Sequence, residues 1–182
     1  MNIVAIDVSY PSVKITKKNL KSIKETEILR ADGNNLPFRD SSFDLTFCRL
    51  APHKIKEVYR VLRKKGSYIL YRCGHTTGWK ELEDVEFEDR IMMFCEQEWY
   101  KTPVSRLERL RERGFREVHE TDFLMKDYYS LGQIQRMLEF DPIIRGFDRD
   151  KNKSKLENLQ TKYVSERGIQ LTGDPLILFA TK

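Results

Sequence analysis

The chain has 182 residues, 40% of them hydrophobic and 34% charged, a balance typical of one globular domain that is long enough to bury a core. No apolar run approaches the roughly 20 residues of a membrane-spanning helix, and no leader-like segment follows Met1, so we expect a cytoplasmic protein. Three widely spaced cysteines exclude a Cys-x-x-Cys metal or redox motif and predict free thiols. The net charge of +5 is compatible with a polyanionic partner, but a lysine- and glutamate-rich surface explains it more simply.

Strands and helices alternate in the first half of the chain. A short, β-branched apolar run at residues 2–7 indicates a strand buried on both faces, and apolar residues at helical spacing precede Gly66, which we expect just past a helix end. The expected strands are 2–7, 27–31, 43–48 and 67–72, and the expected helices are 9–19 and 53–62. This alternation predicts a parallel sheet with right-handed crossovers.

The second half is less regular. We expect a largely helical segment over residues 78–114 and a strand over 115–125. Two shorter helices are expected at residues 131–140 and 153–167. The last expected strand covers residues 169–181 and is split by a Gly-Asp-Pro sequence.

A series of short motifs carries a family resemblance. After Asp7 come Ala-Asp-Gly-Asn-Asn-Leu-Pro-Phe at 31–38, Ser-Phe-Asp at 42–44 and Arg-Val-Leu-Arg-Lys-Lys-Gly at 60–66. This order resembles the class I S-adenosylmethionine-dependent methyltransferases, and the resemblance is specific from about residue 3 to residue 70. It implies S-adenosyl-L-methionine as the cofactor. It also implies an α/β, Rossmann-like fold: a mostly parallel sheet with helices on both faces and an antiparallel C-terminal strand.

The resemblance also implies how a single domain, 1–182, is organised. Residues 1–75 form the cofactor-side half, and residues 76–182 supply helical insertions and closing strands. In open α/β sheets, ligands bind outside the carboxyl ends of the strands. Asp7, with Val8 beside it, is placed there to accept hydrogen bonds from the ribose hydroxyls. The alternative role of Asp7 is to cap the helix that follows.

The second acidic residue, Asp32, is placed by the resemblance to accept from the adenine amino group, with the backbone of Gly33 close by. Its alternative role is an Asx turn. The segment containing Arg49 and Leu50 should flank the cofactor, although a surface role is usual for such an arginine.

Four residues are expected on the substrate side of the cleft: Pro52, His53, Tyr71 and Arg72. His53 is a candidate general base, but a solvated residue in the first helical turn is more common. We expect Cys48 and Cys73 to be structural thiols on neighbouring strands. No catalytic triad is required, because methyl transfer depends mainly on aligning the acceptor with the sulfonium methyl group.

One family feature is missing. The superfamily normally begins with a strand and a glycine-rich loop that precede the first acidic residue, but no glycine occurs before Gly33. We therefore expect an N-terminally truncated domain, or a chain whose first strand lies upstream of Met1. If the sheet closes over the gap, residues 2–7 should pair with residues 43–48. Alternatively, a homodimer or a partner chain completes the sheet.

A weaker resemblance points to RNA. Ala-Pro-His-Lys at 51–54, Tyr-Ser-Leu at 129–131, Met-Leu at 137–138 and Pro142 are similar to bacterial ribosomal RNA guanine-N1 methyltransferases. The sequence therefore predicts methyl transfer to an unidentified small-molecule or RNA acceptor. The alternatives are a non-catalytic binding module and, more narrowly, an RNA base methyltransferase.

Overall fold

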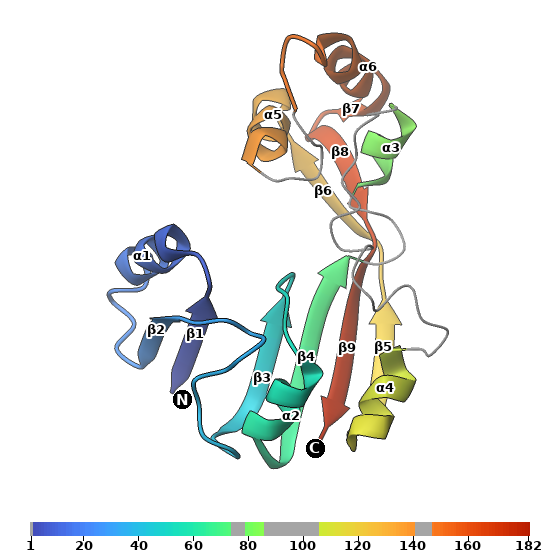
Figure 1. Ribbon diagram of the computed structural model, residues 1–182. Coiled ribbons are helices and arrows are strands. Elements are labelled where there is room, and N and C mark those ends of the chain that lie inside the picture. Colours follow the sequence, from blue (N-terminus) through green and yellow to red (C-terminus); the bar gives the residue numbers. More distant parts are fainter. Residues whose placement is uncertain (1, 74–78, 86–105, 141–146) are drawn as a thin grey trace. The chain divides into compact units, whose positions relative to one another are not determined.

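The computed structural model describes residues 2–73, 79–85, 106–140 and 147–182. The chain divides into two compact units (Figure 1). The first comprises Met1–Leu70, Leu107–His119 and Leu178–Lys182, and the second comprises Tyr71–Arg106 and Glu120–Ile177. In the described ranges, no helix is both long enough and apolar enough to cross a membrane.

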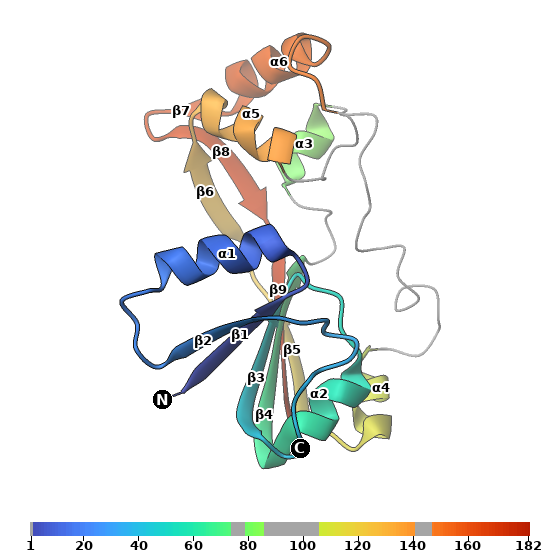
Figure 2. The same ribbon diagram turned by 60° about the vertical axis from the view of Figure 1, so that its left-hand side comes forward.

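The first unit begins with two parallel strands joined by a helix. β1 (Ile3–Asp7) pairs with β2 (Thr26–Arg30), and Ile3 is opposite Thr26 in the register. The connecting helix α1 (Tyr10–Asn19) starts at Ser9, whose hydroxyl caps the helix, and ends beside two lysines that complement the helix dipole. Figure 2 shows α1 lying along the β1–β2 pair, with which it packs through the buried Val13.

A four-stranded sheet forms the rest of this part of the fold. Its order is β3–β4–β9–β5, where β3 is Phe43–Arg49, β4 Leu62–Cys73, β9 Pro175–Thr181 and β5 Arg116–Asp122. β3 and β4 run in the same direction and β9 runs oppositely (Figure 1). The Rossmann-like fold is confirmed, including its parallel part and its antiparallel C-terminal strand.

Two helices cover one face of this sheet. They are α2 (Ile55–Val61) and α4 (Arg106–Arg113), both in front of the sheet in Figure 1. The ring of Tyr59 on α2 packs edge-on against Phe115, and Phe115 also contacts the buried ring of Tyr68 on β4. The fully buried residues of the helices and the sheet include Val61 on α2, Leu110 on α4, Leu62 on β4, and Leu178 and Ala180 on β9. Burial of these side chains is the main force that holds the two helices on the sheet.

The expected pairing of residues 2–7 with residues 43–48 is wrong. In the described ranges β1 pairs only with β2, and β3 pairs only with β4. The β2–β3 connection is instead fixed to the segment after β3. Lys54 N donates to Gly33 O at 3.3 Å, and Leu36 N donates to a Glu57 carboxylate oxygen at 3.0 Å. These bonds hold the loop after β2 at the loop after β3 without bringing β1 against β3.

The expected role of Gly66 as a helix terminator is also wrong. α2 ends at Val61, and β4 begins at the next residue. Lys65, with φ of 66°, takes the left-handed conformation that is typical of a helix-ending glycine. Gly66 is buried inside β4, where a Cβ would lie only 2.8 Å from Arg63 O. The glycine therefore marks close backbone packing.

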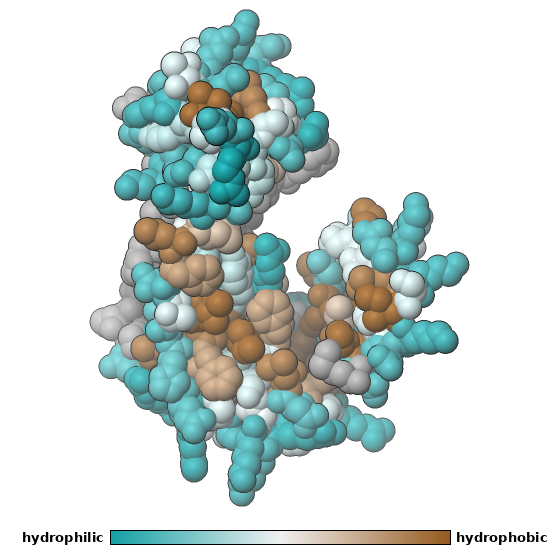
Figure 3. Space-filling view, turned by 180° about the vertical axis from the view of Figure 1, so that it is seen from behind, coloured by the Kyte–Doolittle hydropathy of each residue, from teal (hydrophilic) through white to brown (hydrophobic). Residues whose placement is uncertain are grey.

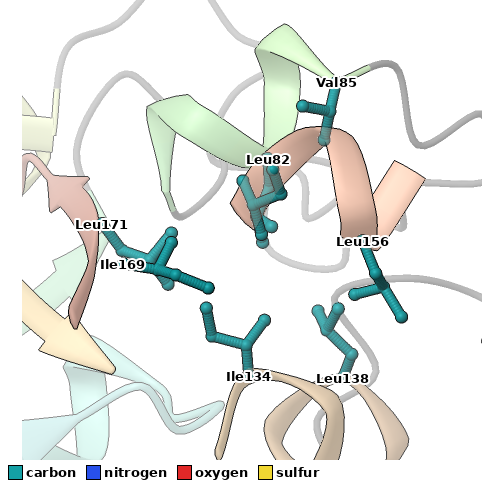
Figure 4. Close-up of a cluster of buried hydrophobic side chains, with 8 residues drawn as sticks. Leu82, Val85, Ile134, Leu138, Leu156, Ile169 and Leu171 are labelled. Carbon is teal, nitrogen blue, oxygen red and sulfur yellow. The ribbon is translucent and has the colours of Figure 1, made fainter. Parts of the chain in front are cut away.

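The second unit has a core of its own. Its small antiparallel sheet consists of β6 (Met125–Tyr129), β8 (Gly168–Gly173) and β7 (Val164–Ser165) in that order. Three helices pack on it: α3 (Lys80–Asp84), α5 (Leu131–Phe140) and α6 (Lys153–Tyr163). Figure 4 shows the core, to which these elements contribute Leu82, Val85, Ile134, Leu138, Leu156, Ile169 and Leu171.

The sequence located most of these elements. The helix at 131–140 and the break between the two last strands are confirmed, since β8 ends at Gly173 and β9 begins at Pro175. The helix expected at 153–167 ends earlier, at Tyr163, because the chain turns into β7. Of the helical segment expected at 78–114, only α3 and α4 and their flanks fall within the described residues.

Candidate functional site

Asp7 is held at the carboxyl end of β1 by the turn that leads into α1. Its Oδ1 accepts a hydrogen bond from Ser9 N at 2.7 Å, but the helix cap, the alternative role named for Asp7, is Ser9 itself, two residues later. Its backbone oxygen accepts from Ala31 N at 3.1 Å, which ties this end of β1 to the residue before Asp32. Asp7 is exposed, and the side chain of the adjacent Val8 is 64% exposed.

Asp32 makes the expected Asx turn. Its Oδ1 accepts from the backbone N of Asn34 at 2.8 Å and from Nδ2 of the same residue at 3.0 Å. These bonds orient the carboxylate and leave Oδ2 without a hydrogen bond to any residue that the structure describes. The same holds for Oδ2 of Asp7. Each acidic residue therefore has one oxygen that fixes the local backbone and one that can accept from a ligand.

Gly33 brings the loop after β2 against the loop after β3. A Cβ on Gly33 would lie 2.7 Å from Pro52 O and 3.1 Å from the Cβ of His53. Only glycine fits at this approach, because any side chain would push the two loops apart. The structure thus brings together Asp7, Asp32, Gly33, Pro52 and His53 around the carboxyl ends of β1, β2 and β3.

His53 lies in a partly buried hydrogen-bonded network. Its Nδ1 is 2.9 Å from Ala51 O and 3.0 Å from Cys48 Sγ, and its Nε2 is 2.6 Å from the hydroxyl of Tyr68. A carbonyl oxygen only accepts, so Nδ1 carries the proton and Nε2 of the neutral ring accepts from Tyr68. Burial lowers the pKa of His53 and raises the pKa of the Cys48 thiol.

This network defines what His53 does in the fold. The solvated first-turn position suggested as its alternative is not observed, because the ring is partly buried and hydrogen-bonded on both nitrogens. The geometry does not favour a general base either, since Nε2 is occupied by Tyr68. Cys48 is a free, half-buried thiol, as expected. The side chain of Cys73 lies outside the described residues, so its expected position beside Cys48 stays a prediction.

The other predicted residues occupy less defined positions. Arg49 is exposed at the end of β3, and Leu50 has a φ of 49°, a conformation that leucine rarely adopts. Such strain is often found at functional sites, where the surrounding structure maintains it. Tyr71 and Arg72 fall in the second unit, so their place beside the cofactor cleft stays a prediction. Pro142 of the RNA-related motif lies outside the described residues.

Arg60 holds the Leu-Pro-Phe motif at residues 36–38 in a hydrogen-bonded clamp that the sequence did not predict. Arg60 donates to Phe38 O at 2.6 Å, to Leu36 O at 2.9 Å and to Asp40 Oδ1 at 2.9 Å. It also pairs with Glu57 at 2.7 Å, and this bond is the main reason that the pKa of Glu57 is lowered. The signal for this clamp was the spacing of Glu57 and Arg60, three residues apart on one helix face.

Comparisons with known proteins agree with this architecture. Residues 1–70 match the family model described as "Methyltransferase domain". A malonyl-[acyl-carrier protein] O-methyltransferase from Marinomonas sp. (strain MWYL1) is 32% identical over 75 residues. That match covers 37% of this chain and only 27% of that protein.

Two solved structures extend the comparison to the whole chain. The YcgJ protein from Bacillus subtilis has a TM-score of 0.61 at 16% identity, with 100% of this chain and 82% of that chain covered. The phosphoethanolamine N-methyltransferase 2 of Haemonchus contortus, in complex with phosphomonomethylethanolamine and S-adenosylhomocysteine, has a TM-score of 0.51 at 16% identity. There the match covers 100% of this chain and 44% of the other. These likenesses concern the fold.

Proposed function

We propose that this chain is a class I S-adenosylmethionine-dependent methyltransferase that binds S-adenosyl-L-methionine and supports methyl transfer to a small-molecule acceptor, because residues 1–70 match a methyltransferase family model. The main support for this proposal is that the loop after β2 contacts the loop after β3 at the carboxyl ends of the strands. Asp7 and Asp32 stand at this place, which is where open α/β sheets bind their ligands.

The chemistry of these donors and acceptors fits the adenosine part of the cofactor. Asp7 would accept hydrogen bonds from the ribose hydroxyls through Oδ2, while Oδ1 stays bonded to Ser9 N. Asp32 would accept from the adenine amino group in the same way, while its Oδ1 holds the Asx turn. Carboxylates are strong acceptors for both groups. Val8, Gly33, Arg49 and Leu50 complete the proposed cofactor contacts.

The cofactor supplies an activated methyl group on its sulfonium when it is bound. The residues of this chain then have to orient the acceptor and exclude water, and no proton need pass through His53. We assign Pro52 and His53 to the acceptor side. The network around His53 keeps the loop after β3 in one conformation, so His53 is a positioning residue in this proposal.

We choose a small-molecule acceptor because one structurally similar protein was solved with its ligands bound. The Haemonchus contortus enzyme was solved with a small phosphorylated amine and a spent cofactor, which supports a small molecule more directly than RNA. No described feature of this chain favours an RNA base over such an acceptor. A domain that folds but binds no cofactor remains the competing proposal, and it would act as an interaction module.

Binding of S-adenosylhomocysteine to the 182-residue chain, measured by calorimetry, tests this proposal. Asp7→Ala should weaken binding by about 1.5–3 kcal/mol, because a carboxylate that accepts two hydrogen bonds is lost. Asp122→Ala, which removes an exposed carboxylate at the end of β5, is the matched control and should bind like the wild type. Equal affinities for all three proteins would refute the ribose assignment. No binding by the wild type would favour the non-catalytic module.

A further inference from the structure

The excess positive charge of the chain is concentrated in one short segment. Residues 10–24 contain five lysines and no acidic residue. We call these five residues the lysine patch; they are Lys14, Lys17, Lys18, Lys21 and Lys24. Removing them from the 33 Lys and Arg residues of the chain leaves 28, which equals the number of Asp and Glu residues. The net charge of +5 therefore resides in this segment and is not spread over the surface.

The lysine patch lies on α1 and on the turns that follow it. Lys14, Lys17 and Lys18 are three and four residues apart, which places them on one side of the helix. Leu20 N donates to Thr16 O at 2.9 Å where the helix ends. All five lysines are exposed, and no carboxylate of the described residues forms an ion pair with any of them. Their charges are therefore available to a ligand.

Helix stability accounts for only part of this pattern. Lys17 and Lys18 are in the last turn of α1, where they complement the negative end of the helix dipole. Lys14, Lys21 and Lys24 lie outside that turn. Like charges three or four residues apart repel each other and destabilise a helix, so a stable surface helix would carry glutamates among these lysines. The pattern is better explained by binding to an anionic partner.

A groove of about 380 Å³ lies beside the lysine patch, between the end of α1 and β2. Its apolar lining residues are Leu20, Ile23, Ile28 and Leu29. Lys17, Lys21 and Lys24 line the same groove, and Glu27 is the one carboxylate among its lining residues. Figure 2 shows α1, the turn after it and β2, which enclose this groove. In Figure 3, hydrophilic side chains project around apolar ones on the part formed by α1, β1 and β2, at the right of the view.

We propose that this groove binds an acidic amphipathic helix of a partner protein. Apolar side chains of that helix enter the groove against Leu20 and Ile23, which is 48% exposed. Its carboxylates pair with the lysine patch. In this mode of recognition, apolar anchors provide affinity and complementary charges select the partner. The inference goes beyond the proposed function and does not depend on cofactor binding.

Other polyanions match the groove less well. Sites for single-stranded nucleic acid combine basic residues with aromatic rings on which bases stack, and no aromatic residue lines this groove. A membrane surface requires apolar side chains that protrude, whereas Ile28 is buried and Leu20 is half-buried. A second copy of this chain would offer its acidic run at residues 81–84. In that run Leu82 is fully buried and Asp84 pairs with Lys162, so it is not free to dock.

Titration of a synthetic peptide into the isotope-labelled 182-residue chain, followed by NMR, tests the proposal. The probe is a helical peptide of about 15 residues with leucine at i, i+3, i+4 and i+7 and glutamate at the flanking positions. We expect its amide shift changes to be confined to residues 14–29. Binding should weaken about tenfold or more when salt rises from about 0.05 M to about 0.5 M, because exposed ion pairs are screened.

Two double variants separate a specific site from an effect of net charge. Lys21→Glu with Lys24→Glu reverses two charges of the groove and should raise the dissociation constant about tenfold or more. Lys64→Glu with Lys126→Glu is the matched control, because both lysines are exposed outside the groove and the net charge falls equally. It should leave binding within about twofold of the wild type. Ile23→Ala, which removes an apolar contact of the groove, should weaken binding about fivefold.

Four outcomes would overturn the proposal. The first is no peptide binding at millimolar concentration, or equal losses in the two double variants. The second is unchanged affinity of a peptide whose leucines are replaced by serine, since charge alone would then be recognised. The third is tighter binding of single-stranded RNA or of phosphatidylglycerol vesicles, lost in Lys21→Glu with Lys24→Glu, which would identify a different polyanion. The fourth is a groove that is already filled, either in a dimer that this double variant dissociates or by additional residues of a longer native chain.

Discussion

The hydrogen bond between Tyr68 and His53 should contribute measurably to the stability of the first unit. The Tyr68 side chain is fully buried, so water cannot replace its hydroxyl in Tyr68→Phe. The phenyl ring keeps its contact with Phe115, at 5.8 Å between centroids. The loss therefore includes the short bond of 2.6 Å that the hydroxyl donates to His53 Nε2. Such a loss costs about 1–3 kcal/mol of unfolding free energy.

Native-state hydrogen exchange of the β4 amides measures this cost within the first unit. Tyr128→Phe is the matched control, because the Tyr128 hydroxyl is 3.4 Å from Gln170 Oε1 and that long contact should be worth less than about 0.5 kcal/mol. We expect Tyr68→Phe to be clearly the more destabilising of the two. If both variants lose the same free energy, or if β4 exchange in Tyr68→Phe equals that of the wild type, the assigned network is wrong.

Two further predictions concern His53 and Gly33, and Gly132 in the second unit serves as the comparison for Gly33. Because burial lowers the pKa of His53, the unfolded chain binds a proton at this residue before the folded chain does. Stability should therefore be fully present above about pH 6.5 and fall as the pH drops below it, and urea midpoints of His53→Gln should fall less than those of the wild type. Gly33→Ala should destabilise by about 1–3 kcal/mol through overpacking against Pro52 O. Gly132→Ala, in α5 with open space around it, should instead stabilise by about 0.5–1 kcal/mol, and thermal melts of the two variants separate these effects.

The sequence located most strands and helices because their signals are local. Apolar periodicity placed β1, α1 and β2 to within a residue or two at each end. The pairing of β1 was missed because it depends on which strands are present to compete for its edge, and no local pattern encodes this. Gly66 was misassigned because a glycine demanded by close backbone packing has the same sequence signal as one that ends a helix.

The candidate site was predictable only in part. The acidic residues at the strand ends follow from a position rule, and Asp7 and Asp32 occupy those positions. The partner of His53 could not be predicted, because Tyr68 lies 15 residues away and meets it through the packing of β4 beneath α2. The ion pair of Arg60 with Glu57 could have been predicted, because both residues are on the same helix. Its bonds to backbone oxygens could not, because no residue pattern indicates them.

The separate core of the second unit affects which substitutions the protein can tolerate. Its buried side chains come from α3, α5, α6 and β8, all within that unit. Substitutions that reshape this part are therefore absorbed by its own packing and need not disturb the strand ends that hold Asp7 and Asp32. The second unit can therefore vary while the first unit keeps its structure. Denaturation of the protein also need not be a single cooperative transition, because each core can melt at its own temperature.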